Sequence, residues 1–594
     1  MKNKKIYIYG IVIIALVAIL AVLIKFTIGG NSNSSNSSSY TSSTSSTSSS
    51  GNNITTYNSE IKKETTSVEQ KDKRGDEDIS EYDTTINLSS LTYEGSGVTI
   101  SEKTITITKA GTYYFTGTLN DGNIVVNAGD DDNVVLVFEN ANITSTNTAV
   151  INGINAKNIY INIKEGTTTF TDSSNYTVFT EDDEPDATVF SKTDLIINGK
   201  GTLVINSNYK DAVASKDDLV ITNVTLQITS NDDGIRGKDS VDIKDASITI
   251  NSKGDGIKST NDTDETKGYI VIDNSKISIT SEADAVQAET VVDLKDVDLT
   301  INTTGDIKNA DVSSKGIKSG KEITIESGNI NITSTDDSIH SNYYVIINGG
   351  NITLSSGDDG IHADTNIIIN NGTVDITKSY EGIEATYIEI NNGKINVVAS
   401  DDGLNASDGS GSTEFGGRQE SFSSNSNVQL VINGGDIYVN ANGDGLDANG
   451  SITQTGGNVI VVGTSNSGNG ALDYDKTFDI SGGSLVVYGA TGMWQNPSNT
   501  STQYSICFST SGSANDKIEV KDSNGNTISS FTTEKSYSAI LVSDSNLKQG
   551  ETYTLYVNGN QVSSLELTSI VTSQISGNGM MGGGQMNKGS NRMR

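Results

Sequence analysis

A short acidic motif returns along this chain at an interval of 22 residues. The sequence STDDSIH at Ser334–His340 reappears as SGDDGIH at Ser356–His362, and shorter versions occur at Asp232–Arg236 and Asp401–Asn405. A fixed period this short is typical of a solenoid, in which successive coils stack and equivalent residues form ladders. The motif therefore predicts columns of like residues along the fold.

Each repeat contains the pattern of three strands. Residues 343–363 show two alternating apolar and polar segments, an Asn-Gly turn, an acidic turn and a very short third segment. Alternation places successive side chains on opposite faces of a strand. Three strands in about 22 residues predict an all-β chain folded as a parallel β-helix. The turn asparagines Asn348, Asn370, Asn391 and Asn433 should hydrogen-bond to one another from coil to coil.

Composition narrows the class of partner. The formal net charge is -34, which argues against nucleic acid, because nucleic-acid binding depends on Lys and Arg neutralising phosphates. The same charge suits an extracellular protein and cation binding. One cysteine, Cys507, allows no internal disulfide framework, and with only two histidines a zinc site of the usual Cys/His type is disfavoured.

The N-terminus has the pattern of a membrane anchor. Residues 1–5 form a basic tail, and the run at 6–24 is apolar apart from Tyr7, Tyr9 and Gly10. This run is long enough to span a bilayer, and we expect the membrane anchor over residues 6–28. No clear cleavage site follows, so an uncleaved signal anchor is favoured over a cleaved signal peptide. This places the rest of the chain outside the cell, at the cell surface, after a Ser/Asn/Thr-rich and charged linker at 29–81.

The remaining chain divides into three parts. We expect the parallel β-helix over residues 82–483 and a small β-sandwich-like cap over 484–570, which would protect the open end of the solenoid. Residues 571–594 have the Gly/Met-rich composition of a disordered tail. The longest insertion, near residues 407–427, is either a ligand-contacting loop or a tolerated surface insertion.

Aligned coils place acidic residues in one column. Neighbouring coils lie about 4.8 Å apart, and two carboxylates at that distance repel by about 3 kcal/mol at an effective dielectric near 20. Calcium is the hard cation expected between such oxygens outside a cell, although single aspartates could simply cap turns. The predicted Ca²⁺ ligands are Asp232, Asp233, Asp255, Asp336, Asp337, Asp358, Asp359, Asp401, Asp402 and Asp444.

A basic column follows the acidic one. Its members, interrupted at Gln287, are Arg236, Lys258, Lys318, His340 and His362. A basic stripe on so acidic a chain could bind a uronate-rich polysaccharide. The alternative is that these side chains neutralise the neighbouring acids. The tyrosines near these coils, including Tyr343 and Tyr380, offer at most a modest stacking surface and are more typical of strand filler.

These coils resemble a known family. The motifs that carry the resemblance are residues 190–199 (FSKTDLIING), 208–213 (NYKDAV), 232–239 (DDGIRGKD), the later Asp-Asp-Gly-Ile coils and residues 550–556 (GETYTLY). Together they are similar to the carbohydrate-binding domain family of cell-surface β-helix proteins, which is related in fold to pectate lyases. The resemblance covers residues 82–559. It implies a right-handed parallel β-helix, bound calcium and non-catalytic binding of cellulose or polygalacturonate. Lys315 departs from the acidic pattern.

Four functions are therefore open. The first is a monomeric, calcium-dependent polysaccharide-binding protein without catalytic residues. The second is a pectate lyase, in which a base such as Arg236, Lys238 or Lys258 would remove a proton from the uronate. The third is a hydrolase using paired carboxylates, although its Gly-His-Gly and Arg-Ile-Lys motifs are missing from the sequence. The fourth is a structural adhesin or stalk.

Overall fold

The computed structural model describes residues 79–180, 184–306, 313–408 and 428–575. All of them lie in the second of two compact units, Thr56–Arg594. Every regular element in the described residues is a β-strand. The predicted all-β class with parallel strands is confirmed.

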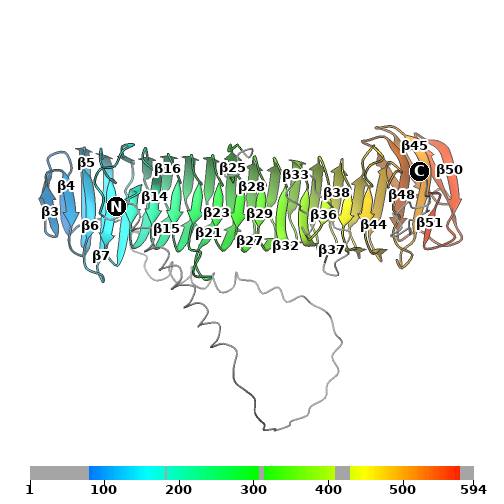
Figure 1. Ribbon diagram of the computed structural model, residues 1–594, viewed down its shortest axis with the longest axis horizontal. Coiled ribbons are helices and arrows are strands. Elements are labelled where there is room, and N and C mark those ends of the chain that lie inside the picture. Colours follow the sequence, from blue (N-terminus) through cyan, green and yellow to red (C-terminus); the bar gives the residue numbers. More distant parts are fainter. Residues whose placement is uncertain (1–78, 181–183, 307–312, 409–427, 576–594) are drawn as a thin grey trace, which may run out of the picture. The chain divides into compact units, whose positions relative to one another are not determined.

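In the regular coils, one strand belongs to each of three parallel ladders. In two consecutive coils, β15 pairs with β18 in the first ladder and β16 with β19 in the second. The short strands β17 and β20 pair in the third ladder. The partners Ile235 and Ile257 lie 22 residues apart, so the sequence period is the structural period. Figure 1 shows these strands following one another in chain order. The bounds are Asp218–Thr222 (β15), Thr225–Ser230 (β16), Ile235–Gly237 (β17), Ser240–Lys244 (β18), Ser247–Ser252 (β19) and Ile257–Ser259 (β20).

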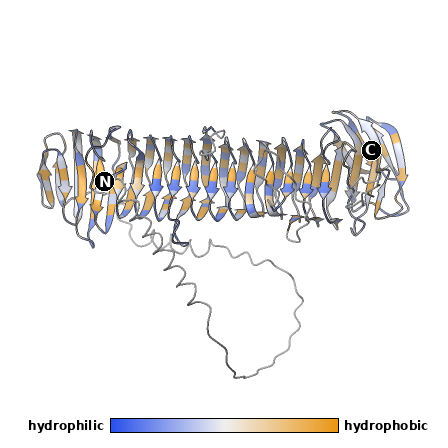
Figure 2. Cartoon of the chain, in the orientation of Figure 1, coloured by the Kyte–Doolittle hydropathy of each residue, from blue (hydrophilic) through white to orange (hydrophobic). Residues whose placement is uncertain are grey.

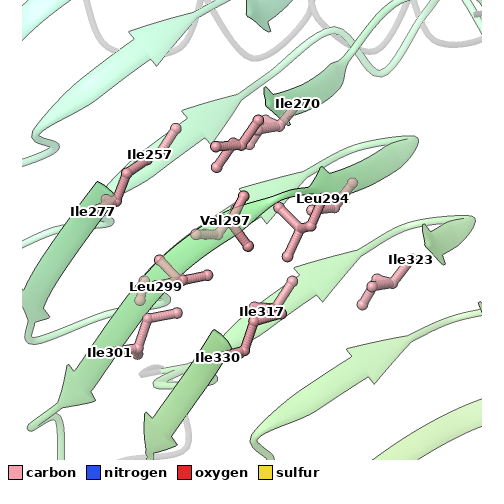
Figure 3. Packing of buried hydrophobic residues seen from close by; sticks show 14 of the residues in the cluster. Ile257, Ile270, Ile277, Leu294, Val297, Leu299, Ile301, Ile317, Ile323 and Ile330 are labelled. Atoms are coloured by element: carbon pink, nitrogen blue, oxygen red, sulfur yellow. The ribbon is translucent and has the colours of Figure 1, made fainter. Parts of the chain in front are cut away.

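Aliphatic side chains from all three ladders fill the inside of the coils. In β25 (Val297–Thr303) alternate residues are buried, and Leu299 and Ile301 contribute to the core. They lie near Ile317 of a short strand and Leu294 of the first ladder (Figure 3). The same alternation appears as hydrophobic and hydrophilic bands along the strands in Figure 2. Because each core residue stacks on its equivalent one coil away, β-branched Ile and Val suit these positions.

The predicted asparagine ladder is present at one corner of the coils. The side-chain amide of Asn370 donates to Asn348 at 2.8 Å, Asn391 donates to Asn370 at 2.9 Å, and Asn433 donates to Asn391 at 2.9 Å. Gly350 and its equivalents follow with positive φ, here 93°, a conformation that favours glycine. This corner therefore holds the coils in register by side-chain hydrogen bonds.

The C-terminal strands change from parallel to antiparallel pairing. β44 (Ser484–Gly489) is parallel to β41 (Asn458–Val462) and antiparallel to β48 (Tyr537–Asp544), so it joins the coils to the strands that follow. A separate antiparallel sheet, in the order β47-β46-β49-β50, shares a second core with Phe508 and Ile540. β51 (Val571–Ser573) pairs with β45 (Ser505–Gly512), although the sequence assigned residues from 571 onward to a tail. The bounds of the separate sheet are Lys517–Lys521 (β46), Thr527–Thr532 (β47), Thr552–Val557 (β49) and Asn560–Glu566 (β50).

Several predicted segments lie outside the described residues: the basic tail at 1–5, the membrane span at 6–28, the linker up to residue 78, most of the insertion (409–427) and the tail from residue 576. Among the residues that are described, no helix has the length and apolar character needed to cross a bilayer.

Candidate functional site

The acidic column lies in the turns that precede the short strands. The Asp233 backbone N–H donates to Asp211 Oδ1 at 3.2 Å, the Asp255 N–H to Asp233 Oδ1 at 2.8 Å, and the Asp284 N–H to Asp255 Oδ1 at 2.8 Å. The same bond joins the Asp359 N–H to Asp337 Oδ1 at 3.0 Å and the Asp444 N–H to Asp402 Oδ1 at 2.6 Å. One carboxylate oxygen in each of these coils thus accepts a backbone hydrogen bond from the next coil. This explains why the turn needs a short acidic side chain.

The basic column lies on the second residue of each short strand. Arg236, Lys258, Gln287, Lys318, His340 and His362 are register partners in successive strands. The strands are β17, β20, β23 (Val286–Ala288), β26 (Ile317–Ser319), β29 (Ile339–Ser341) and the start of β32 (Ile361–Ile369). The predicted adjacency of the two columns is therefore found in the structure.

The bases contact the second carboxylate oxygen of the acids. Arg236 Nε donates to Asp211 Oδ2 at 2.6 Å, and Lys258 Nζ lies 2.6 Å from Asp255 Oδ2. Lys318 Nζ lies 3.2 Å from Asp284 Oδ2. These contacts are the ones expected if the basic side chains neutralise the neighbouring acids, the alternative to polysaccharide binding. The side chains remain only 14% exposed for Arg236 and 30% for Lys318, so little of each cation faces solvent.

The two histidines continue the ion-pair column. His340 Nδ1 lies 2.8 Å from Asp337 Oδ2, and His362 Nδ1 lies 3.0 Å from Glu384 Oε2 and 3.3 Å from Asp359 Oδ2. The two rings stack, with centroids 4.8 Å apart. Burial alone would lower the pKa of His362, but the bonds to Asp359 and Glu384 outweigh it and raise that pKa to about 11. The imidazolium is thus the favoured form at neutral pH.

Asp211, Asp232 and Asp233, here called the carboxylate triad, have oxygens within 4.8 Å of one another. Burial, with the nearby charges of Asp233 and Asp186, raises the pKa of Asp211 to about 7 even though Arg236 opposes the shift. Burial and Asp233 also raise the pKa of Asp232. Burial is the main cause in both residues, and the neighbouring carboxylates add to its effect.

Lys315, Asp336 and Asp337, here called the lysine triad, occupy the equivalent places in a later pair of coils. Asp211 and Lys315 each stand two residues before register-equivalent residues, Val213 and Ile317, of the short-strand ladder. Lys315 Nζ donates to Asp336 Oδ1 at 2.9 Å and to Asp337 Oδ2 at 2.6 Å. Burial would raise the pKa of Asp337, but His340 and Lys315 hold it well below its usual range. An ammonium group here lies between carboxylates.

The other predicted calcium ligands are arranged less uniformly. Asp336, Asp337 and Asp358 form a second cluster of close carboxylates, and Asp359 forms one with His362 and Glu384. Asp255 pairs with Lys258. Asp401 lies in the turn whose Asp402 accepts the Asp444 N–H. The structure thus groups some predicted ligands and gives Asp255, Asp402 and Asp444 roles in linking coils.

One carboxylate cluster was missed by the sequence analysis. Asp194, Asp217 and Asp218 bring carboxylate oxygens within 4.8 Å at another corner of the coils. Burial and neighbouring acids raise the pKa of Asp194 to about 6 and that of Asp217 to about 7. The signal was present as Lys-Thr-Asp at 192–194 and Lys-Asp-Asp at 216–218. It was overlooked because the coils were aligned on the acidic turn alone.

The fold and the paired columns define a parallel β-solenoid held together partly by ion pairs between coils. Residues 101–360 of this solenoid match the model of a family described as carbohydrate-binding domain-containing protein. The resemblance to this family that the sequence indicates is thus confirmed over these residues.

Two similar proteins extend the comparison. A carbohydrate-binding domain-containing protein of Acetivibrio thermocellus is 35% identical over 135 residues, which are 22% of this chain and 47% of that protein. The chain thus spans about half the length of this curated relative. A solved structure of a polysaccharide lyase-like protein from C. thermocellum, a gadolinium derivative, is 29% identical. It covers 38% of this chain and 96% of its own, with a TM-score of 0.33.

Proposed function

We propose that this protein is a non-catalytic, polysaccharide-binding protein. The observation that carries the proposal is that the coils matching the carbohydrate-binding family hold two of the three candidate bases, Arg236 and Lys258, in ion pairs. Burial alone would lower the pKa of Lys258, but Asp255 and Asp233 outweigh it and raise that pKa, and acids act in the same way on Arg236. A lyase needs an unprotonated base to remove the uronate proton. Cations stabilised by acids favour binding over proton abstraction.

Binding and catalysis can be separated with the full chain. The protein is incubated with insoluble cellulose and with polygalacturonate, bound and free fractions are measured, and ultraviolet absorbance of unsaturated uronate products is followed in parallel. We expect retention on at least one polysaccharide and no rise in absorbance. A steady rise would support the lyase alternative, and absence of retention on either polymer would support the adhesin or stalk.

We further propose that the carboxylate triad binds a calcium ion. The donor set suits Ca²⁺, which prefers several carboxylate and carbonyl oxygens. Asp186, which shares Arg236 with Asp211, also has a buried oxygen, Oδ1, without a hydrogen-bond partner among the described residues. When bound, calcium would neutralise the mutual repulsion of Asp211, Asp232 and Asp233. The remaining predicted ligands stay candidates for further calcium ions.

Calcium binding predicts a gain in stability. A ligand at 100 times its Kd stabilises the folded state by about 2.7 kcal/mol. We therefore expect the melting temperature to rise with added calcium and to fall with EDTA. Asp232→Asn should remove much of this response, because it takes one charge from the triad. Asp131→Asn is the matched control, because it removes an exposed carboxylate that is not among the candidate calcium ligands. An equal calcium response in Asp232→Asn and in the unaltered chain would contradict the assignment.

We propose a cell-surface location, with residues 6–28 as a membrane anchor. The support is the length and apolar character of this segment and the basic residues before it. The full chain should sediment with membranes of the expressing cell and resist extraction by high salt. A variant that lacks residues 1–28 should not sediment with the membranes. Equal sedimentation of this variant and the full chain would contradict the anchor.

A further inference from the structure

A groove crosses the outer face of the second ladder near the C-terminal strands. It has a volume of about 490 Å³. Residues of the strands β33, β35, β38 and β41 line it. The bounds of the first three are Thr373–Ser379, Lys394–Ala399 and Asp436–Ala441. The groove lies away from the acidic and basic columns, because those columns occupy the turns and short strands that follow this ladder in each coil.

Four side chains in register form the floor of the groove. Asp375, Asn396, Tyr438 and Ile460 are partners in successive strands. Their neighbours Val374, Ile395, Ile437 and Val459 are buried in the core, so alternation directs the four floor residues outward. Asn396 Nδ2 donates to Asp375 Oδ1 at 2.6 Å. The floor is therefore polar at one end and aromatic and aliphatic at the other.

The apolar end of the floor is held rigid. Tyr438 and Ile460 pack against the core of the C-terminal strands, which fixes both side chains. Glu534 lines the groove beside them and accepts a hydrogen bond from Asn440 Nδ2 at 3.2 Å. Its backbone N–H donates to the Tyr488 hydroxyl at 3.1 Å. Glu534, which forms a wall of the groove, is thus hydrogen-bonded to residues of the coils. The groove therefore exists before a ligand binds.

The groove continues over the glycine turns. A second hollow of about 300 Å³ shares Asp436 and Asn458 with the first and is lined by Gly393, Gly435, Gly457 and Gly483. These glycines have φ between 77° and 109°, a region that side chains disfavour. Because these four positions carry no side chain, the hollow stays open across several coils.

The charges around the groove favour a neutral ligand. Asp375, Asp436 and Glu534 contribute three carboxylates, and Lys394 is the one basic residue among the described lining residues. A uronate chain would be repelled by this excess of negative charge. Carboxylate and amide groups can instead accept and donate hydrogen bonds to sugar hydroxyls, while the tyrosine ring and Ile460 can contact the apolar face of a sugar ring.

The spacing of the floor residues also suits an extended glycan. Consecutive floor residues are about 4.8 Å apart, since they lie on adjacent parallel strands. That step is close to the length of one pyranose unit in an extended β-linked chain. We propose that the groove floored by Asp375, Asn396, Tyr438 and Ile460 binds a neutral, extended glycan across the coils. This inference rests on the proposed polysaccharide-binding function and assigns it a site and a substrate class.

The test uses cellohexaose as the neutral probe and hexagalacturonate as the charged one. Binding of each to the full chain is measured by calorimetry, with circular dichroism to verify folding of every variant. We expect cellohexaose to bind and hexagalacturonate to bind more weakly. Tyr438→Ala should weaken cellohexaose binding about tenfold or more, which is about 1.4 kcal/mol. Tyr438→Phe keeps the ring and should retain binding. Asp375→Asn tests the polar end without altering the core.

Tyr343→Ala is the matched control, because Tyr343 is 50% exposed and lies outside the groove. Equal loss in Tyr343→Ala and Tyr438→Ala, or unchanged affinity in both Tyr438→Ala and Asp375→Asn, would overturn the groove assignment while leaving polysaccharide binding intact. Stronger binding of hexagalacturonate than of cellohexaose would overturn the substrate class. If the chain binds neither hexasaccharide and is retained on neither polymer, the proposed function itself fails.

Discussion

The carboxylate triad and the lysine triad occupy equivalent places in the solenoid but differ in one residue. Where the first has Asp211, the second has Lys315, whose ammonium bonds to Asp336 and Asp337. The pKa values respond in opposite directions: burial and Asp233 raise that of Asp211 to about 7, whereas His340 and Lys315 hold that of Asp337 below its usual range despite burial. The repeat can thus carry its compensating cation within the chain or leave carboxylates for a cation from solution.

The exchange of an acid for Lys315 connects an irregularity of the repeat with the stability of the coils. Breaks in the acidic column, such as Lys315, are positions where the charge balance between coils is set locally. We expect a coil with a lysine to balance its charges without a metal ion, and a coil with three carboxylates to gain stability from the proposed calcium ion. Substitutions that exchange the two arrangements should therefore change stability and calcium response in opposite ways.

The largest expected effect comes from removing the acid of the lysine triad. Asp337→Ala leaves His340 without its carboxylate, leaves Lys315 with Asp336 alone, and takes away the acceptor of the Asp359 N–H. Breaking a buried ion pair of this kind costs about 3–5 kcal/mol. Asp232→Asn in calcium-free buffer should change stability by about 0.5 kcal/mol or less, because Asp232 is exposed and repelled by Asp233. Urea denaturation midpoints of both variants measure the contrast, and similar losses would contradict it.

A smaller effect is expected from exchanging the cation itself. Lys315→Asp converts the lysine triad into three carboxylates, so stability without calcium should fall by about 2 kcal/mol and recover in part when calcium is added. Lys315→Met removes the charge but adds no carboxylate. It should lose stability without gaining a calcium response. Melting temperatures with calcium and with EDTA decide the outcome, and an equal calcium response in the two variants would count against the comparison.

Much of the fold could be predicted from the repeat. The 22-residue interval between Ile339 and Ile361 is the register of the short strands, and the turn asparagines form the expected ladder. Both features depend on residues one coil apart, so a single period describes them. The two charged columns were also predicted, because each is a fixed offset from the apolar residue of the short strand.

The 22-residue period could not predict two features, the contacts of Lys315 and the groove. The first depends on the direction of a side chain, and the second on segments distant in the sequence. In the sequence, Lys315 interrupts the acidic column. In the structure, its flexible side chain reaches the carboxylates of the following coil. The groove needs Glu534, which lies 96 residues after Tyr438 in the sequence and in no repeated coil. Alternation along β38 places Tyr438 on the outer face, but the packing of the C-terminal strands against it makes that position a floor.

The smallest effect concerns the histidine end of the paired column, where the internal cation can be titrated. His362 faces Asp359 and Glu384 through Nδ1 and Asp364 through Nε2, and it stacks on His340. Its folded pKa of about 11 lies above the ordinary 6.5. A raised histidine pKa contributes stability that is fully present below pH 6.5 and declines as pH rises toward 11. His362→Gln should therefore be less stable than the unaltered chain at pH 6, with a difference that shrinks by pH 10. Since the chain has two histidines, imidazole NMR signals can be assigned with this variant. A His362 titration centred near pH 6.5 would show that the acids do not hold it as a cation, and the column would then depend on Arg and Lys alone.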